Sequence, residues 1–123
     1  TPYSFALQDG GTDTFKLTDI GQTSEINRFM NSLYKTYVAN GIPVVIGEFG
    51  ARDKGGNLLS RVTFAAYYTA NATARNMPCV WWDNNYLERR DESFALFDRE
   101  TLTCHSPKLV KAIIANSHPS NHD

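Results

Sequence analysis

Two short, uninterrupted apolar runs most constrain what this chain can fold into. The first is Val44-Val45-Ile46 and the second is Cys79-Val80-Trp81-Trp82. Runs of this length without polar alternation are typical of strands that are buried on both faces, as in parallel sheets. Each run follows a segment in which apolar residues recur at helical spacing. The sequence therefore predicts an α/β fold, in which parallel strands alternate with helices.

Apolar residues recur at helical spacing in the segments that are predicted to be helices: 24–40, 60–76 and 107–116. For the first helix, Thr23 or Ser24 is the expected cap, and Gly41 suits a left-handed end. For the last helix, Ser106 is the expected cap and Pro107 the first helical residue. The predicted order is therefore helix, strand, helix, strand, helix.

The remaining segments show no strong periodicity. Residues 1–22 are predicted to be irregular, with a weak strand at 14–17, and residues 83–93 to be a long polar loop. The chain is interpreted as one unit, 1–123, whose end at 117–123 is expected to be a mobile tail. Two strands alone leave their outer edges unpaired, so the pattern also predicts a missing part of the sheet or a partner chain.

The composition excludes several classes of function. The chain has 123 residues, of which 41% are hydrophobic and 20% charged, and its net charge is −1. Nucleic-acid-binding proteins carry a clear basic excess, so no nucleic acid partner is expected. No apolar stretch approaches the roughly 18 residues that cross a membrane, and no signal peptide opens the chain. Neither metal-ligand spacing nor a glycine-rich phosphate loop is present, so no metal and no cofactor are expected.

The two cysteines, Cys79 and Cys104, leave two interpretations open. They are either free thiols, one of them a small core residue, or a disulfide. A disulfide requires Cβ atoms about 3.8 Å apart, which the sequence does not reveal.

Glu48 is the residue that most directly suggests chemistry. It follows the first predicted strand and lies between Gly47 and Gly50. Catalytic residues of α/β barrels sit at the carboxyl ends of strands, and glycines allow a ligand to approach the backbone closely. A carboxylate in this position acts as a base, a nucleophile or a metal ligand. The alternative is a structural glutamate that caps an amide or pairs with an arginine.

Trp81 and Trp82 end the next predicted strand, at the same edge of the sheet as Glu48. Strand alternation sends the two indoles to opposite faces, so one is expected to point toward a ligand and the other toward the helices. The flat apolar face of an indole suits a pyranose ring, and the inward indole is expected to lie near Glu48. The alternative is that both indoles belong to the core.

The loop that follows has two possible roles. Asp83, Asn84 and Asn85 either donate and accept hydrogen bonds with sugar hydroxyls or simply turn the chain, which is a common use of these residue types. The charged run at 88–92 is expected to be a solvated loop.

Two longer motifs carry a family resemblance. Residues 42–51 read Ile-Pro-Val-Val-Ile-Gly-Glu-Phe-Gly-Ala, and residues 78–84 read Pro-Cys-Val-Trp-Trp-Asp-Asn. In this order and spacing they resemble glycoside hydrolase family five, and within it the rumen-type endo-β-1,4-glucanases (cellulases). Residues 1–7 and 94–99 also fit, and the match runs from the first residue to about Ala115.

The resemblance implies a fold and a reaction. Members of the family are (β/α)8 TIM barrels, so the chain would be the C-terminal portion of such a barrel and would itself form an incomplete barrel. The reaction is hydrolysis of internal β-1,4-glucosidic bonds with retention of configuration, carried out by two carboxyl groups. Glu48 would be the nucleophile. The partner would be a β-glucan polysaccharide or oligosaccharide, and the parent enzyme would be extracellular.

Further residues receive roles by the same resemblance. Trp82 would stack under the sugar at the cleavage point, with Trp81 turned outward. Tyr3 would belong to the loop after the sixth strand. The residues implied near the neighbouring sugar are Ala51, Asp53, Lys54, Asp83 and Asn84.

The chain also departs from the family pattern. It lacks the Asn-Glu pair that holds the acid/base glutamate and the His-x-Tyr motif of the sixth strand, and Asn85 and Ala95 stand where glycine is common. General acid catalysis contributes about 10²- to 10⁴-fold, so the chain alone is expected to be weakly active or inactive. The alternatives are a β-glucan-binding fragment without catalysis and a structural fragment in a swapped homodimer. The sequence does not choose among cellulose, mixed-linkage glucan, xyloglucan and mannan.

Overall fold

Helices and short strands alternate along the chain in the computed structural model, which describes residues 2–88 and 92–119. In chain order the elements are α1 (Tyr3–Ala6), α2 (Ile20–Thr36), the 3-10 helix η1 (Val38–Asn40), β1 (Ile46–Phe49), α3 (Leu58–Thr73), β2 (Cys79–Trp81), β3 (Phe97–Asp98), β4 (Thr103–Cys104) and α4 (Pro107–Asn116). The α/β alternation predicted from the sequence is confirmed.

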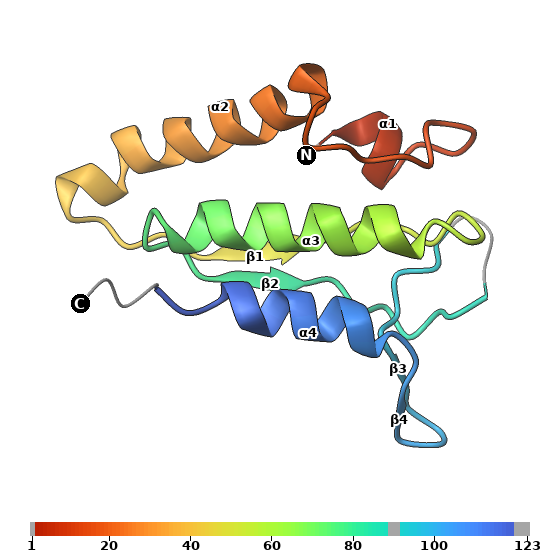
Figure 1. Ribbon diagram of the computed structural model, residues 1–123. Coiled ribbons are helices and arrows are strands. Elements are labelled where there is room, and N and C mark those ends of the chain that lie inside the picture. Colours follow the sequence, from red (N-terminus) through yellow and green to blue (C-terminus); the bar gives the residue numbers. More distant parts are fainter. Residues whose placement is uncertain (1, 89–91, 120–123) are drawn as a thin grey trace.

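The strands β1 and β2 run parallel and are connected by α3, the helical crossover that a parallel pair requires. Figure 1 shows α3 lying along this pair, with α2 and α4 on either side of it. The hairpin of β3 and β4 is antiparallel and projects beyond the helices. The described residues thus form an open α/β arrangement with two separate two-stranded sheets and no closed barrel.

An aromatic cluster fills the core between α3 and β1. Phe64 of α3 is fully buried, and its ring lies 5.5 Å from the rings of Phe5 and Phe15. On the strand side, Phe49 of β1 stacks on Tyr68 with ring centroids 4.6 Å apart. Ring pairs of this kind contribute about 0.5–1.5 kcal/mol each beyond burial of their area. The cluster fixes β1, which carries the candidate carboxylate, against the helix behind it.

The first long helix begins earlier than predicted. α2 starts at Ile20 because the Asp19 carboxylate accepts a hydrogen bond from the Gln22 amide at 3.2 Å and so caps the helix. Thr23, one of the two expected caps, lies inside the helix instead. The helix ends at Thr36, four residues before the predicted end at 40, and η1 follows it. Gly41 follows η1 with φ of 78°, so the left-handed conformation expected of this glycine is confirmed.

The prediction for residues 1–22 was also incomplete. Residues 3–6 form the helix α1, in which Phe5 and Ala6 are buried, and the weak strand expected at 14–17 does not form. A four-residue helix is too short to show a hydrophobic period, and core packing rather than helix propensity stabilises it. Thr1 lies outside the described residues.

The first strand differs from the prediction in position and in burial. β1 covers residues 46–49 rather than 44–46, so Glu48 lies within the strand and not after it. Burial on both faces was wrong for the described residues, because Gly47 and Glu48 are exposed and Val45 is 65% exposed. The helices cover one face of the strand, and no described segment covers the other.

The remaining elements agree more closely. α3 begins and ends two and three residues before the predicted 60–76, and β2 covers Cys79–Trp81. Burial of β2 on both faces was wrong as well, because Val80 is 52% exposed. α4 matches the predicted 107–116, although the Ser106 hydroxyl forms no capping hydrogen bond. The hairpin of β3 and β4 was not predicted, since strands of two residues leave no pattern.

Two predicted segments extend beyond what the structure describes. Residues 89–91 of the polar loop and of the charged run, and residues 120–123 of the predicted tail, lie outside the described residues. The cysteine question has a definite outcome, because Cys79 and Cys104 are both free thiols. Burial raises the pKa of the Cys79 thiol, which keeps it protonated and unreactive at neutral pH.

Replacing Gly11 by alanine is expected to destabilise the fold. An added Cβ atom would collide with the backbone carbonyl oxygen of Ser4, which cannot move aside as a flexible side chain would. Overpacking of this kind costs about 1–3 kcal/mol. Thermal unfolding followed by circular dichroism should show a lower midpoint for the variant. Gly47→Ala is the matched control because its new Cβ would meet no atom within 4 Å; equal midpoints for the two variants would contradict the close contact.

Candidate active site

The carboxyl ends of β1 and β2 bring Glu48 and Trp82 to the same hollow. The Trp82 amide donates a hydrogen bond to the Phe49 carbonyl oxygen at 2.8 Å, which ties the two strand ends together. The hollow has a volume of about 260 Å³, and the residues that line it are Leu7, Glu48, Phe49, Gly50, Trp82 and Phe94. The position expected from the parallel strand order is therefore confirmed, while the chemical roles of these residues stay predictions.

The Glu48 carboxylate is accessible to a ligand. The residue is exposed, and its side chain has no hydrogen bond or ion pair with any described residue. The alternative of a structural glutamate that caps an amide or pairs with an arginine therefore has no support among the described residues. A carboxylate that nothing orients is also a poor catalyst by itself, since positioned groups contribute much of enzymatic rate enhancement.

The two tryptophans separate as strand alternation predicts. The Trp81 ring contacts the Phe49 ring edge-to-face at 5.4 Å, and its indole nitrogen donates to the Phe94 carbonyl oxygen at 2.9 Å. Trp82 is 45% exposed and lines the hollow beside Glu48. Trp81 is thus a core residue, and Trp82 offers an indole face to a ligand.

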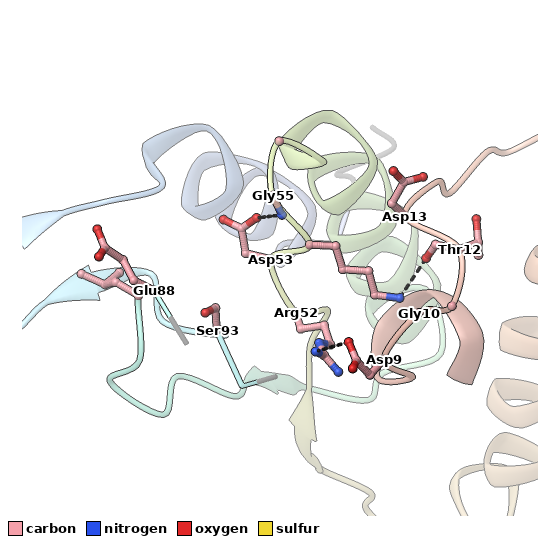
Figure 2. Close-up of a pocket in the computed structure, with 13 residues that line it drawn as sticks. Asp9, Gly10, Thr12, Asp13, Arg52, Asp53, Gly55, Glu88 and Ser93 are labelled. Atoms are coloured by element: carbon pink, nitrogen blue, oxygen red, sulfur yellow. Dashed lines mark hydrogen bonds and ion pairs between the residues drawn. The ribbon is translucent and has the colours of Figure 1, made fainter. Parts of the chain in front are cut away.

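A larger hollow of about 800 Å³ lies between residues 9–13, the loop after β1 and the loop after β2 (Figure 2). Its lining residues are Asp9, Gly10, Gly11, Thr12, Asp13, Arg52, Asp53, Lys54, Gly55, Gly56, Leu87, Glu88 and Ser93. Two residues implied by the family resemblance, Asp53 and Lys54, are among them. Polar side chains of both signs surround this hollow, which suits hydrogen bonding to hydroxyl groups rather than binding of one charged group.

Lys54 joins the loop after β1 to the start of the chain. Its ammonium group donates hydrogen bonds to the carbonyl oxygens of Ser4 at 2.7 Å and Thr12 at 2.9 Å. Burial lowers the pKa of Lys54, the Arg52 charge lowers it further, and Asp13 and Asp9 oppose both effects. Two of the three ammonium donors are used in this way, so one remains to reach a ligand in the larger hollow.

Arg52 makes a second connection between the same segments. The side chain is buried and donates to the Leu7 carbonyl oxygen at 2.8 Å, while its other terminal nitrogen lies 3.2 Å from an Asp9 carboxylate oxygen (Figure 2). The Arg52 amide also donates to the Ala6 carbonyl oxygen. Arg52 and Lys54 together hold residues 2–13 against the loop that follows the candidate nucleophile.

Arg61 of α3 contacts the loop after β1 and the end of β2. It is 2% exposed, donates to the Ala51 carbonyl oxygen at 3.0 Å and lies 3.5 Å from the Asp53 carboxylate. Its guanidinium carbon also lies 5.9 Å from the centre of the Trp81 ring. Burial lowers the pKa of Arg61, which the Asp53 charge partly offsets. The side chain thus links the β1–α3 loop to β2.

Asp83 and Asn84 are engaged within their own loop. The Asp83 carboxylate accepts hydrogen bonds from the amides of Asn85 and Leu96, both at 2.9 Å. Asn84 donates to the Glu92 carbonyl oxygen at 2.7 Å and accepts from the Tyr86 amide. Of the two roles left open by the sequence, turning and holding the loop is the one that these contacts support, and sugar binding stays a prediction.

Three other positions singled out in the sequence lie outside the two hollows. Ala51 is fully buried, and its implied place near a sugar stays a prediction. Tyr3 is 62% exposed on α1 and lines neither of the two hollows described here. Asn85 has φ of 67°, a left-handed conformation that glycine adopts without cost and asparagine tolerates better than most residues.

Sequence reasoning missed Leu7, Phe94 and Arg61. Leu7 and Phe94 line the hollow over Glu48 although they come from segments distant in sequence. Phe94 belongs to a motif that fits the family, and that motif was the available signal. Arg61 had a weaker signal, a lone charged residue on the apolar side of a predicted helix.

Two parallel strands, each followed by a helix, that carry a carboxylate and an indole at their carboxyl ends are the architecture of a portion of an α/β-barrel enzyme. The chain belongs to the cellulase family, glycosyl hydrolase family 5, whose family model matches residues 1–88. The family resemblance noted in the sequence is thereby confirmed.

The relatives are longer than this chain. Endoglucanase B of Neocallimastix patriciarum is 41% identical over 114 residues, a match that covers 93% of this chain and 23% of that protein. Endoglucanase A of Clostridium longisporum is 37% identical over 123 residues, with 97% of this chain and 24% of that protein covered. The chain therefore spans about a quarter of the length of these relatives.

Solved structures match the same portion. A lichenase of this family from Caldicellulosiruptor sp. F32, solved as a mutant with cellotetraose, superposes with a TM-score of 0.91 and 46% identity over 95% of this chain and 32% of the other. A broad-specificity endoglucanase from Ruminococcus champanellensis with bound cellotriose gives a TM-score of 0.84 and 38% identity over 93% and 32% of the two chains. The chain thus corresponds to about a third of these structures, and these relatives bind cello-oligosaccharides.

Two further findings concern the described residues only. None of the described helices is long and apolar enough to cross a membrane. Among the same residues, no group of three or more histidine, cysteine, aspartate or glutamate side chains could hold a metal ion.

Proposed function

We propose that this chain supplies the nucleophile of a retaining endo-β-1,4-glucanase, with Glu48 as the attacking carboxylate. The observation that carries the proposal is a carboxylate that has no partner among the described residues and shares one hollow with the exposed indole of Trp82, at the carboxyl ends of parallel strands. An indole face binds the apolar face of a glucose ring, and the carboxylate then lies beside that sugar. Membership of the cellulase family supports the same reaction.

The reaction would proceed in two steps. The Glu48 carboxylate forms a bond to the anomeric carbon while the bond from that carbon to the leaving oxygen breaks, and a second carboxylic acid protonates the leaving oxygen. Water then attacks the same carbon, gives its proton to the second carboxylate and releases Glu48. Two inversions give overall retention. The two carboxyl groups of such a site lie about 5–5.5 Å apart.

The second carboxyl group would come from the remainder of the barrel. The chain contains no Asn-Glu pair, which holds the acid/base glutamate in the family that it resembles. Without a positioned acid, the rate falls by about 10²- to 10⁴-fold. The chain alone is therefore expected to be weakly active or inactive, and the complete domain is the expected hydrolase.

The substrate and its location follow from the same chemistry. Cello-oligosaccharides are bound by relatives of known structure, so a soluble or insoluble β-1,4-glucan is the proposed substrate class. A polysaccharide does not cross a membrane, and the parent enzyme is accordingly proposed to act outside the cell.

A chimaera tests this function directly. In it, this chain replaces the matching third of the Caldicellulosiruptor sp. F32 lichenase, whose fold it matches with a TM-score of 0.91. The chimaera should release reducing sugar from carboxymethylcellulose or lichenan, whereas the 123-residue chain alone should release little or none. Circular dichroism and gel filtration establish that both proteins are folded. A folded chimaera that does not hydrolyse either glucan would overturn the proposal.

Glucan binding without catalysis is a second candidate for the isolated chain. The exposed Trp82 indole favours it, because stacking on a sugar does not require the second carboxyl group. Isothermal titration of the chain with cellotetraose tests this function. An affinity that is clearly lower in Trp82→Ala supports it, and the absence of any binding heat in the folded wild-type chain rules it out.

A further inference from the structure

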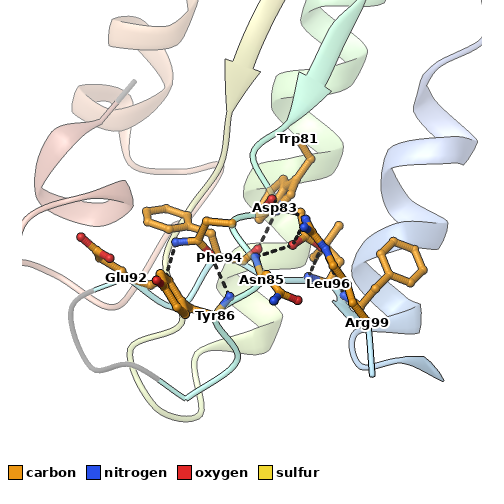
Figure 3. Close-up of polar contacts among 10 residues, drawn as sticks. Trp81, Asp83, Asn85, Tyr86, Glu92, Phe94, Leu96 and Arg99 are labelled. Atoms are coloured by element: carbon orange, nitrogen blue, oxygen red, sulfur yellow. Dashed lines mark hydrogen bonds and ion pairs between the residues drawn. The ribbon is translucent and has the colours of Figure 1, made fainter. Parts of the chain in front are cut away.

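The Asp83 carboxylate is the centre of a network of polar contacts (Figure 3), and it directly follows Trp82 in the sequence. One of its oxygens accepts from the Asn85 amide at 2.9 Å and from Arg99 at 3.2 Å. The other accepts from the amides of Leu96 at 2.9 Å and Phe97 at 3.3 Å. Because Asp83 directly follows Trp82 in the chain, these contacts fix the backbone from which the indole projects.

The same network also holds a second residue that lines the hollow. Phe94, which lines the hollow with Trp82 and Glu48, lies two residues before Leu96. Its carbonyl oxygen accepts the hydrogen bond from the Trp81 indole at 2.9 Å. The chain at Phe94 is therefore anchored on one side by Trp81 and on the other by the Asp83 carboxylate.

We infer that Asp83 is a positioning residue that holds both Trp82 and Phe94 in place in the hollow that contains Glu48, and that it does so through Leu96, Phe97 and Arg99. The inference rests on the proposed function for its consequence in sugar binding. It differs from the role that the family resemblance implies, in which Asp83 lies against the sugar itself.

The occupancy of the carboxylate favours positioning over direct contact with a sugar. A carboxylate has about four acceptor sites, and four donors already use them in the structure. Among the described residues, the charged group that faces Asp83 is Arg99. Burial opposes ionisation of Asp83, but the three amide hydrogen bonds and the Arg99 charge outweigh it and lower the pKa of this carboxyl group. Asp83 is thus ionised at neutral pH and fully engaged.

Asp83→Asn is the decisive variant, because it preserves shape but replaces one acceptor oxygen by a donor group. Whichever carboxylate oxygen the amide nitrogen replaces, it faces N–H groups from which it cannot accept a hydrogen bond. At least one pair of hydrogen bonds is therefore lost. In ¹H–¹⁵N spectra of the full chain, the Leu96 or Asn85 amide should exchange with solvent about tenfold faster. The Trp82 indole N–H resonance should shift at the same time, without any sugar present.

Asp98→Asn is the matched control. The Asp98 carboxylate likewise accepts hydrogen bonds from two amides, those of Glu100 and Thr101, and its pKa is likewise lowered, chiefly by these bonds. Those bonds lie within the β3–β4 turn and include no residue of the hollow. This variant should change the exchange of the Glu100 and Thr101 amides and leave the Trp82 indole resonance in place. A Trp82 indole resonance that does not respond to Asp83→Asn overturns the inference.

Sugar affinity gives an independent check. Cellotetraose titrations of the wild type, Trp82→Ala, Asp83→Asn and the double variant form a double-mutant cycle. If Asp83 acts through Trp82, its substitution lowers affinity in the wild type but not in the Trp82→Ala background. Equal losses in both backgrounds would show a direct sugar contact and overturn the inference. If no protein binds cellotetraose, the binding proposal for the isolated chain fails, while the indole resonance still decides the role of Asp83.

Discussion

Replacing Glu48 by glutamine in the lichenase chimaera is expected to lower kcat by on the order of 10³-fold or more. The amide cannot attack the anomeric carbon, and the loss of a covalent nucleophile removes the first step of the reaction rather than weakening one contact in it. Substrate binding should change far less, because the Trp82 surface remains. Steady-state kinetics on a soluble glucan measures kcat and KM separately.

Azide rescue shows whether Glu48 acts as the nucleophile or as the acid/base group. In Glu48→Ala, azide has room to attack an activated aryl β-cellobioside from the side of the missing nucleophile, and a single inversion gives the α-glycosyl azide. A β-glycosyl azide would instead mean that Glu48 is the acid/base group, and no change in kcat would mean that it is neither. Glu100→Gln, a change at an exposed position in the β3–β4 turn, is the control and should keep kcat within about threefold of the wild type.

Truncation of Phe64 to alanine is expected to destabilise the chain by about 3–5 kcal/mol. Phe64 is fully buried, and its ring contacts those of Phe5, Phe15, Phe49 and Tyr68. Its removal leaves a cavity where three segments of the chain meet, and neighbouring rings fill such a cavity only in part. Urea unfolding followed by circular dichroism should show a much lower midpoint.

Leu59→Ala provides the comparison for Phe64 on the same helix. Leu59 is 80% exposed, so its truncation should change stability by about 0.5 kcal/mol or less. Similar midpoints for the two variants would contradict the placement of Phe64 at the centre of the core.

Local patterns were sufficient to predict the alternation of helices and strands. The runs at 44–46 and 79–82 and the helix between them are visible because each element has its own period and punctuation. The cap of α2 was not predictable in the same way, since Asp19, Thr23 and Ser24 are all good capping residues. Burial of both faces of β1 was wrong because burial of a second face depends on residues outside the strand, which its own composition does not encode.

The candidate site was predictable where topology alone places residues. Glu48 lies near the end of one parallel strand and Trp82 directly follows the other, so their proximity required no knowledge of side-chain contacts. The contacts of Lys54 with Ser4 and Thr12 and of Arg52 with Leu7 were not predictable, because they end on backbone carbonyl oxygens, which any residue type supplies. The role of Asp83 was hidden for a related reason, since two of its partners are amides 13 and 14 residues away.

The connections between residues 2–13 and the loop after β1 also have a kinetic consequence. Their partners lie 42 to 50 residues apart in sequence, as for Lys54 with Thr12 and with Ser4. Bringing the two ends of a segment of this length together costs about 3 kcal/mol of conformational entropy. The first contact to form incurs this cost, and the later contacts between the same two segments do not. Such contacts therefore form and open together. The contacts that Arg52 and Lys54 make with residues 2–13 are therefore expected to form and break cooperatively. We expect them to form only after the intervening helix and strand have folded.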